Sequence, residues 1–332
     1  MTPFPAADAG RKRAEGRYYT LHNPFGHPAF RAWAAEAGLP GTTVLEPFAG
    51  AGHLLRALDA VGLGGPAVAY DLVPAAEGIA PRDTLADFPP GYDVIVTNPP
   101  YLARNSAVRR GLPFPETPHP DLYLHCLDLC LRHARFVAAI VPDSFLQGGR
   151  LQERCQAVVS LPMPMFGDTE HPVCLALFGP DDAPALEIWI GVRRIGALAD
   201  LRRALPSRKA RIQITFNIRD GVIGLRAIDG HQGPSIRFLP GAEIPPARIK
   251  VSSRSLTRIA IDGIDPARIP DLLEAANATL EEMRRRTGDI FLTAFKGLRA
   301  DGGFRRRLDF ALARDLLHEA ALRSGTASRA DA

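Results

Sequence analysis

The sequence lacks the features of membrane-spanning and secreted proteins. No hydrophobic run in its 332 residues approaches the ~18 residues needed to cross a bilayer. Residues 1–16 are basic and have no apolar stretch of the kind found in a secretory signal. Only 4 cysteines occur, too few in a chain of this length for a disulfide framework. These absences predict a cytoplasmic protein with reduced thiols and no membrane partner.

Metal-ligand and phosphate-loop motifs are also missing. Cys126 and Cys130 lie near His125 and His133, but this spacing matches no common zinc site. Cysteines four residues apart on an apolar helix usually belong to the core, so we expect no metal. The sequence has neither GxGxxG nor Gly-Lys-Ser/Thr, which argues against a pyrophosphate or triphosphate cofactor.

Lysine is scarce, and the basic residues are nearly all arginine. The net charge is +4, but residues 191–258 contain about fourteen basic and about four acidic side chains, an excess that favours an anionic partner. Arginine can bind phosphate or the edge of guanine with two hydrogen bonds. A GC-rich genome explains the choice of arginine over lysine but not this regional excess. The expected nucleic-acid contacts are Arg193, Arg194, Arg208, Lys209, Arg211, Arg254, Lys296 and Arg299.

The first half of the chain alternates strand-like and helix-like segments. This alternation predicts an α/β fold with a doubly wound, mostly parallel, Rossmann-like sheet. The expected strands are 42–45, 66–70, 93–97 and 136–141, and the expected helices are 52–61 and 119–135. Beyond a Gly/Pro-rich boundary at 179–184, strands are expected at 187–192 and 212–218 and helices at 266–286 and 304–322, an α+β region. We therefore expect a flexible basic leader (1–15), a catalytic domain (16–182) and a target-recognition region (183–332).

The tetrapeptide Asn98-Pro99-Pro100-Tyr101 follows the third expected strand. Two consecutive prolines make this loop stiff. The side-chain oxygen of Asn98 and the carbonyl of Pro99 can accept the two protons of one planar NH₂ group. Tyr101 offers a ring for stacking, so the loop predicts chemistry on an amino group.

A glycine-bearing turn, Glu46 to Gly52, follows the first expected strand. Such a turn lets a ligand approach the backbone closely before a helix begins. Asp71 ends the second strand about twenty residues after Gly50, where a doubly wound fold places an acid on ribose hydroxyls. The spacing predicts a ligand that contains adenosine, although an acid at a strand end can also be an ordinary surface residue.

Together these segments resemble the S-adenosylmethionine-dependent amino-methyltransferases of DNA, the gamma-class adenine-N6 enzymes of restriction–modification systems. Gly16-Arg17-Tyr18-Tyr19-Thr20 is similar to the first element of that family, although Leu21 replaces its usual proline. The glycine turn, Asp71, Leu85-Ala86-Asp87-Phe88 and the tetrapeptide follow in the family's order. The resemblance covers residues 16–178, whereas the second half matches nothing residue by residue.

The resemblance implies that S-adenosylmethionine is the methyl donor and that a flipped adenine is the acceptor. It assigns catalysis to Asn98, Pro99, Pro100 and Tyr101, and stacking of the base to Tyr101 and Phe166. Glu46 is expected near the methionine amino group, Asp71 on the ribose, and Asp87 with Phe88 at the cofactor's adenine. The full set of expected cofactor contacts is Tyr18, Thr20, Glu46, Phe48, Ala49, Gly50, Gly52, Asp71, Leu72, Asp87, Phe88 and Asn98.

Several alternatives stay open at this point. The same tetrapeptide occurs in ribosomal RNA adenine methyltransferases and in enzymes that methylate a glutamine amide in release factors. Glutamine enzymes carry a helical domain before the glycine turn, which favours nucleic acid here, and the basic second half favours duplex DNA. Cytosine presents a similar NH₂ group, and a catalytically inert DNA-binding module is a non-enzyme alternative. Expected partners are duplex DNA and a cognate restriction endonuclease.

Overall fold

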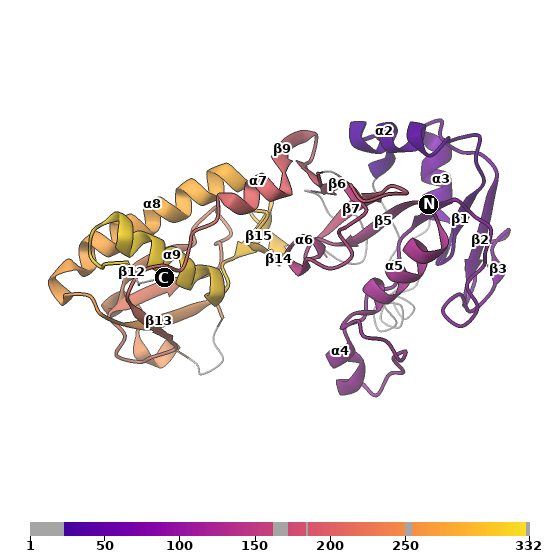
Figure 1. The fold of residues 1–332 in the computed structure, drawn as a ribbon. Helices are drawn as coiled ribbons and strands as arrows, with labels where there is room; N and C mark the ends of the chain where they lie inside the picture. The colour runs from indigo at the N-terminus through magenta and orange to yellow at the C-terminus, as the bar shows by residue number, and fades with distance from the viewer. Residues whose placement is uncertain (1–22, 162–171, 184, 250–253, 330–332) are drawn as a thin grey trace. The chain divides into compact units, whose positions relative to one another are not determined.

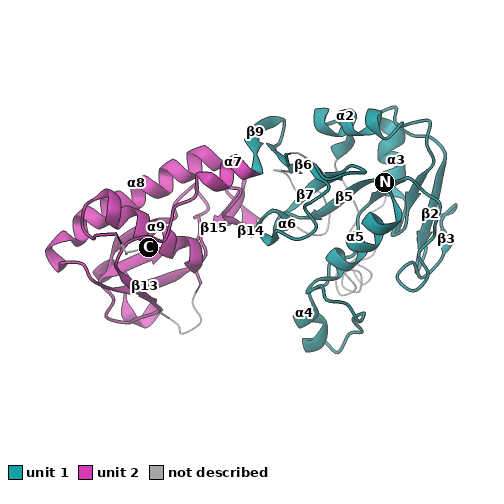
Figure 2. Cartoon of the chain, in the orientation of Figure 1, with its two compact units in different colours: residues 1–198 teal, residues 199–332 magenta. Residues whose placement is uncertain are grey.

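A computed structural model of the chain describes residues 23–161, 172–183, 185–249 and 254–329. The expected leader, Tyr18, Thr20 and Phe166 lie outside these residues. The chain divides into two compact units, Met1–Leu198 and Ala199–Ala332 (Figure 2). No helix in the described ranges is long and apolar enough to cross a membrane.

The first unit is built on a nine-stranded sheet with the order β3-β2-β1-β4-β5-β7-β6-β8-β9 (Figure 1). The first five strands in this order are parallel, β7 runs antiparallel to both β5 and β6, and β8 is parallel to β6 and antiparallel to β9. The predicted doubly wound, mostly parallel sheet is therefore confirmed. The strands are β1 Val44–Glu46, β2 Ala67–Asp71, β3 Ala80–Pro81, β4 Val94–Thr97, β5 Phe136–Pro142, β6 Cys155–Ser160, β7 Val173–Phe178, β8 Glu187–Ile190 and β9 Arg193–Ala197.

Helices cover both faces of this sheet. The connection from β1 to β2 contains α3 (His53–Ala60), and the connection from β4 to β5 contains α5 (Leu122–His133). Because parallel crossovers are right-handed and these two run in opposite directions across the sheet, the two helices lie on opposite faces (Figure 1). Every residue of the parallel strand β4 is buried, as strands covered on both faces require, and the same holds for β5 and for the antiparallel β7. Cys126 and Cys130 of α5 are fully buried, as expected of core residues.

An additional helix, α2 (Pro28–Glu36), joins the N-terminal end of the described chain to the sheet. The indole N–H of Trp33 donates a hydrogen bond of 2.9 Å to the carbonyl of Phe178 in β7. The Trp33 ring also meets the ring of Phe136 edge-on, with centroids 6.2 Å apart. The shorter helices of this unit are α4 (Arg104–Arg109) and α6 (Phe145–Gly148).

The first unit extends further than the expected boundary at residue 182. Strand β8 pairs with β6 and β9 pairs with β8, so residues up to Leu198 belong to the first unit. The Gly/Pro-rich segment is thus a loop between two strands of one sheet. Turn-forming residues predict that the chain changes direction, but they do not predict where a unit ends. The hydrogen bonds between β8 and β6 place the residues after this turn in the first unit.

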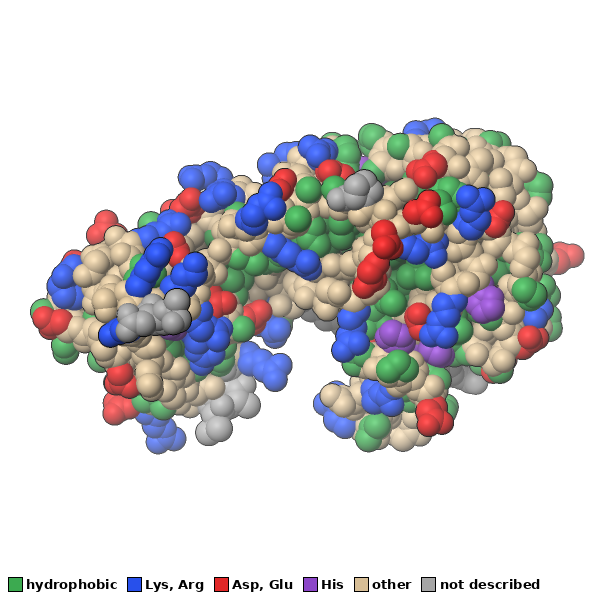
Figure 3. Space-filling view, in the orientation of Figure 1, with side chains coloured by type: hydrophobic (Ala, Val, Ile, Leu, Met, Phe, Trp, Pro, Cys, Tyr) green, Lys and Arg blue, Asp and Glu red, His purple; other side chains and the backbone are tan. Residues whose placement is uncertain are grey.

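The second unit is an α+β structure, as predicted. A four-stranded antiparallel sheet has the order β10-β13-β11-β12, and helices α8 and α9 pack on one of its faces through a shared apolar core. A β-hairpin, β14–β15, completes the unit, and basic side chains are spread over the surface in view (Figure 3). The elements are α7 Leu198–Arg203, β10 Gln213–Phe216, β11 Ile223–Arg226, β12 Arg237–Pro240, β13 Leu256–Asp262, α8 Ile269–Thr287, β14 Thr293–Leu298, β15 Phe304–Arg307 and α9 Phe310–Arg323.

The expected helix over 304–322 is wrong at its start. Residues 304–307 form β15, in which Phe304 and Arg306 are buried and the intervening residues are half-buried. This alternation is that of a strand. The helix begins only after Asp309, whose carboxylate accepts a hydrogen bond of 2.8 Å from the backbone N–H of Leu312.

Asp229 is a fully buried carboxylate at the centre of the second unit. Arg284 donates to both of its oxygens, at 3.1 and 3.0 Å, and Arg299 donates to Oδ2 at 3.2 Å. The backbone N–H groups of Ser235 and Ile236 donate to Oδ1. Burial raises the pKa of Asp229, but the hydrogen bonds from Arg284 and the backbone outweigh it and leave this pKa below its ordinary value.

Replacing Asp229 with Ala should lower the free energy of unfolding by about 3–5 kcal/mol, because two guanidinium groups lose a buried partner. The Asp229 contribution is present above the carboxyl's ordinary pKa and is lost as pH falls through the lower pKa of the folded state. Urea denaturation at several pH values measures both effects. Asp301→Ala is the matched control, since Asp301 pairs with Arg299 but is half-exposed, and its loss of stability should be much smaller because solvent screens exposed ion pairs. Equal losses in the two variants would contradict this role.

Candidate functional site

The candidate site lies where the sheet reverses its direction of winding, between β1 and β4. In such sheets ligands bind beyond the carboxyl ends of the strands at this point. Glu46 ends β1 and pairs with Ala69 of β2, so Asp71 lies two residues further along. On the other side, Leu45 pairs with Ile95 of β4, and the same register places Asn98 two residues beyond the level of Glu46. Strand pairing thus sets Glu46 between Asp71 and Asn98.

Asp71 holds the glycine turn in place. Its Oδ2 accepts a hydrogen bond of 2.8 Å from the N–H of Gly50, and its Oδ1 accepts one of 2.8 Å from the N–H of Val73. The turn is also bound to the end of β2 through the N–H of Ala49, which donates to the carbonyl of Tyr70 at 2.8 Å. Gly50 and Gly52 have φ values of +55° and +70°, which favour glycine. Each Asp71 oxygen keeps a further lone pair for a ligand hydroxyl.

Glu46 is a buried acid with an uncompensated oxygen. Its side chain is 1% exposed, and within the described residues its Oε2 has no hydrogen-bond partner. Burial, and then the nearby charge of Asp71, raise the pKa of Glu46 well above its ordinary value, whereas Arg56 acts in the opposite direction. A buried carboxyl in this state suits a ligand that brings a positive charge and N–H donors.

The tetrapeptide forms a loop that is bonded to the neighbouring strand. The hydroxyl of Tyr101 lies 2.7 Å from Oδ1 of Asn98 and 2.8 Å from the carbonyl oxygen of Ile140 in β5. The Tyr101 ring is 8% exposed and meets the ring of Tyr123 edge-on, with centroids 6.2 Å apart. The sequence suggested a stacking surface at Tyr101, whereas in this conformation its hydroxyl orients the carboxamide of Asn98.

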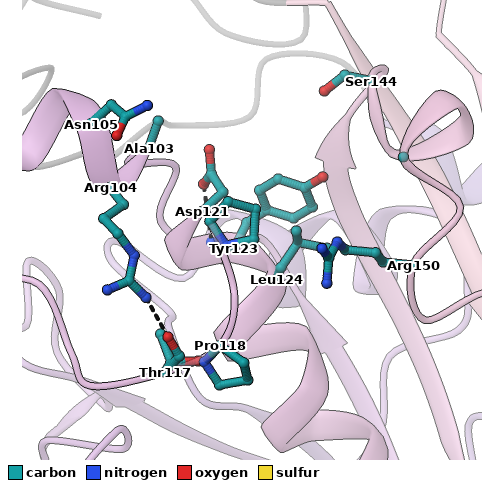
Figure 4. A pocket seen from close by; sticks show the side chains of 12 residues that line it. Ala103, Arg104, Asn105, Thr117, Pro118, Asp121, Tyr123, Leu124, Ser144 and Arg150 are labelled. Atoms are coloured by element: carbon teal, nitrogen blue, oxygen red, sulfur yellow. Dashed lines mark hydrogen bonds between the residues drawn. The ribbon is translucent and has the colours of Figure 1, made fainter.

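A pocket of about 680 Å³ opens beside this loop (Figure 4). Its walls come from the chain after β4, the start of α5 and the chain after β5, and Tyr123 is shared between the pocket and the ring contact with Tyr101. Burial raises the pKa of Asp121, whose carboxylate lies in the pocket wall and accepts from the N–H of Tyr123 at 3.3 Å. The lining combines both charges with an aromatic ring and a hydroxyl: Arg104, Asp121, Tyr123, Ser144 and Arg150.

The other expected cofactor contacts are placed in different surroundings. Leu72 is 63% exposed beyond the end of β2, where an apolar side chain can pack on a ligand ring. Asp87 is exposed and pairs with Arg82 at 2.6 Å, and Phe88 stacks on His133 with centroids 4.8 Å apart. Phe48 is half-buried in the glycine turn.

Sequence reasoning missed Thr84 and Asp121. The buried hydroxyl of Thr84 donates a hydrogen bond of 3.0 Å to the carbonyl of Pro47 in the glycine turn. No sequence signal distinguishes this threonine from others. Asp121 carried a signal, because an Asp directly before an apolar helix is a typical N-cap, and the structure also places it in the pocket wall.

The expected nucleic-acid contacts differ in their availability. Several are bound to acids of their own unit: Arg194 to Glu187 at 2.6 Å, Arg208 to Asp315 at 2.7 Å, and Arg299 to Asp229 and Asp301. Lys296 lies in β14. Arg193, Arg194, Arg208, Lys209, Arg211 and Arg254 are all exposed at the surface.

No protein-family model matches the sequence, and no curated protein matches it. Solved structures resemble parts of the chain. A protein from Listeria monocytogenes described as a class I S-adenosylmethionine-dependent methyltransferase aligns at 14% identity over 48% of this chain and 63% of its own, with a TM-score of 0.34. The methyltransferase subunit of a type I restriction–modification system from Streptococcus thermophilus aligns at 19% identity over 54% of this chain and 48% of its own, with a TM-score of 0.39.

The M protein of the type I restriction enzyme EcoKI aligns at 19% identity over 48% of this chain and 47% of its own, with a TM-score of 0.34. This chain therefore spans less than two thirds of each of the three proteins. Similarities of this size assign neither fold nor activity. The description of the fold rests on the strand order and register of the chain itself.

Glu46→Gln should make the ligand-free protein more stable relative to wild type as pH rises. Because the folded-state pKa of Glu46 is raised, its contribution is fully present below the ordinary carboxyl pKa and is lost as pH rises through the folded pKa. Glutamine has a similar shape but does not ionise, so its contribution to stability does not change with pH. Urea denaturation from about pH 5 to pH 8 measures the difference. A difference between Glu46→Gln and wild type that does not change with pH would contradict the raised pKa of this carboxyl.

Proposed function

We propose that the chain transfers a methyl group from S-adenosylmethionine to the exocyclic N6 amine of an adenine in duplex DNA. The observation that carries this proposal is the position of Asn98 and the rigid proline pair at the carboxyl end of β4, beside the buried carboxyl of Glu46. The loop supplies acceptors for an NH₂ group. The neighbouring strand end supplies a site for a cationic ligand that contains adenosine.

The residues present fit S-adenosylmethionine. Glu46 has an unpartnered oxygen within the described chain and would accept from the methionine ammonium group. Asp71 would accept from the ribose hydroxyls with lone pairs that its backbone contacts leave over, and the exposed Leu72 would pack on the adenine. Asp87 and Phe88 would add contacts at the edge of the adenine, as the family resemblance implies.

Catalysis consists mainly of orientation. When bound, S-adenosylmethionine supplies an activated methyl group on a sulfonium, which needs no metal and no covalent intermediate. The lone pair of an adenine amine is delocalised into the ring, so the amine is a poor nucleophile. Asn98 Oδ1 and the Pro99 carbonyl would accept its two protons and favour a pyramidal nitrogen whose lone pair faces the methyl group.

Tyr101 would act on this step through Asn98. Its hydroxyl carries a single proton but lies within hydrogen-bond distance of two oxygens, those of Asn98 and Ile140. Donation to Asn98 Oδ1 fixes the direction of the carboxamide, and an amide oxygen has two lone pairs, so it can accept from both this hydroxyl and the substrate amine. The hydroxyl therefore positions the catalytic carboxamide, and stacking on the base would require the ring to leave its buried place.

The target base must leave the duplex to reach this loop. The pocket beside it, with Tyr123 in its wall, is large enough to receive part of an extruded nucleotide. Phe166 remains a proposed stacking partner on the basis of sequence. The arginine-rich second unit supports DNA as the polyanion, and the resemblance of the sequence motifs to restriction–modification enzymes extends the proposal to a cognate endonuclease as partner.

Asn98→Ala should reduce methyl transfer by about 10²- to 10³-fold or more, because the acceptor acts where charge develops in the transition state. Binding of S-adenosylmethionine, measured by calorimetry, should stay within a few-fold of wild type. A variant that keeps most of its activity would sink the mechanism. Radiolabelled transfer with duplex DNA, ribosomal RNA and release factor in competition tests the substrate, and label in either of the last two would replace the DNA proposal.

Tyr101→Phe removes the hydroxyl and keeps the ring, so it separates the two roles of this residue. We expect kcat to fall about ten- to hundredfold with little change in KM for DNA, because Asn98 loses its orientation. Tyr101→Ala should in addition raise KM if the ring captures the base. Wild-type kinetics in Tyr101→Phe, measured by steady-state methyl transfer, would leave stacking as the only role.

A further inference from the structure

The outer face of the four-stranded sheet in the second unit carries a group of arginines set by strand register. Arg226 of β11 pairs directly with Arg237 of β12, and both side chains are exposed. On its other side Arg226 pairs with Leu256 of β13. Directly opposed residues on one face have Cβ atoms about 5 Å apart, and like charges at such positions are destabilising.

Two further arginines belong to the same end of this face. The N–H of Ala227 donates a hydrogen bond of 2.9 Å to the carbonyl of Ser255, and the exposed Arg254 is the next residue to Ser255 in the chain. Ile228, two residues after Arg226 on the same face, forms a bridge with Arg307. We call Arg226, Arg237, Arg254 and Arg307 the arginine face.

Among the described residues, acids neutralise the arginine face only weakly. Glu243 approaches Arg237, but the distance is 3.9 Å and both side chains are about half-exposed, a geometry that contributes little. Other arginines of this unit differ: Arg284 and Arg299 are bound to the buried Asp229, and Arg258 donates to two backbone carbonyls.

The rest of the sheet explains why this end is available. Helices α8 and α9 cover the inner face, where Ile223, Leu225 and Phe238 join their core. On the outer face, Leu239 and Leu256 are covered by the segment that carries Ile244 and Ile249. The arginine face lies next to this covered patch, where Arg226, Arg237 and Arg254 are exposed and Arg307 is half-buried.

We propose that the arginine face binds the sugar–phosphate backbone of duplex DNA, a proposal that rests on the proposed function and gives it a surface. Two arginines held side by side, with Glu243 only at 3.9 Å from Arg237, suit phosphates, because each guanidinium can bind two phosphate oxygens and an anion removes the repulsion within the pair. Backbone contacts of this kind set the position of the protein on DNA without determining its sequence preference. The surface differs from the residues suggested by sequence, of which it includes only Arg254.

The test is the double variant Arg226→Ala/Arg237→Ala, with Arg268→Ala/Arg286→Ala as a matched control. The control also removes two exposed charges from the second unit, but these are paired with Asp271 and Glu282. Fluorescence anisotropy with a labelled duplex, from about 50 to 300 mM salt, should show that the slope of log Kd against log salt falls by about 2 in the double variant. Affinity at about 0.1 M salt should fall on the order of tenfold or more, whereas the control should match wild type.

Wild-type slope and affinity in the double variant, with normal DNA binding by the wild-type chain, would overturn this inference and leave the proposed function intact. Failure of the wild-type chain to bind or methylate DNA would instead overturn the proposed function. If the double variant lost affinity for RNA but not for DNA, the arginine face would be assigned to RNA instead of DNA. Denaturation should show no loss of stability in the double variant, since it removes repulsion between neighbours, so weaker binding would not reflect misfolding.

Discussion

The parallel pairing of β1 with both β2 and β4 is the constraint on which the candidate site depends. It brings together three chain segments whose ends carry Glu46, Asp71 and Asn98, although the last two are 27 positions apart in the printed sequence. Because strands in a sheet lie about 4.8 Å apart, small changes in register would separate these groups. The buried strands β4 and β5 hold that register, and the proline pair extends it into the loop that carries Asn98.

Acidic side chains have different roles in this chain because their surroundings differ. Asp71 accepts two backbone hydrogen bonds and fixes the glycine turn. Glu46, one strand away, is buried without a partner for one oxygen, and its pKa is raised. Asp229 is equally buried but is bound by two arginines, and its pKa is lowered. An acid that is buried without compensation is suited to a ligand, whereas a compensated one organises a core.

The arginines divide in the same way. Those that contact Asp229 connect α8 and the β14–β15 hairpin to the loop after β11, and they belong to the interior of the second unit. Those of the arginine face are placed beside one another by strand pairing and are directed to solvent. The excess of arginine in this unit therefore includes side chains that bind buried acids and side chains that lie at the surface. Only the surface arginines are available to a polyanion.

The sequence by itself determined the strands β1, β2, β4, β5 and β8, the helices α3 and α5, the glycine turn and the proline-stiffened tetrapeptide, because apolar runs, glycine and proline act locally on the backbone. It also indicated the α+β character of the second unit. Tertiary structure alone decided that β8 and β9 extend the first sheet, that 304–307 is a strand, that Arg299 binds Asp229, and that the Tyr101 hydroxyl reaches Asn98 and Ile140. Each of these depends on partners distant in sequence, and the pattern of a single segment does not specify which partner it will meet.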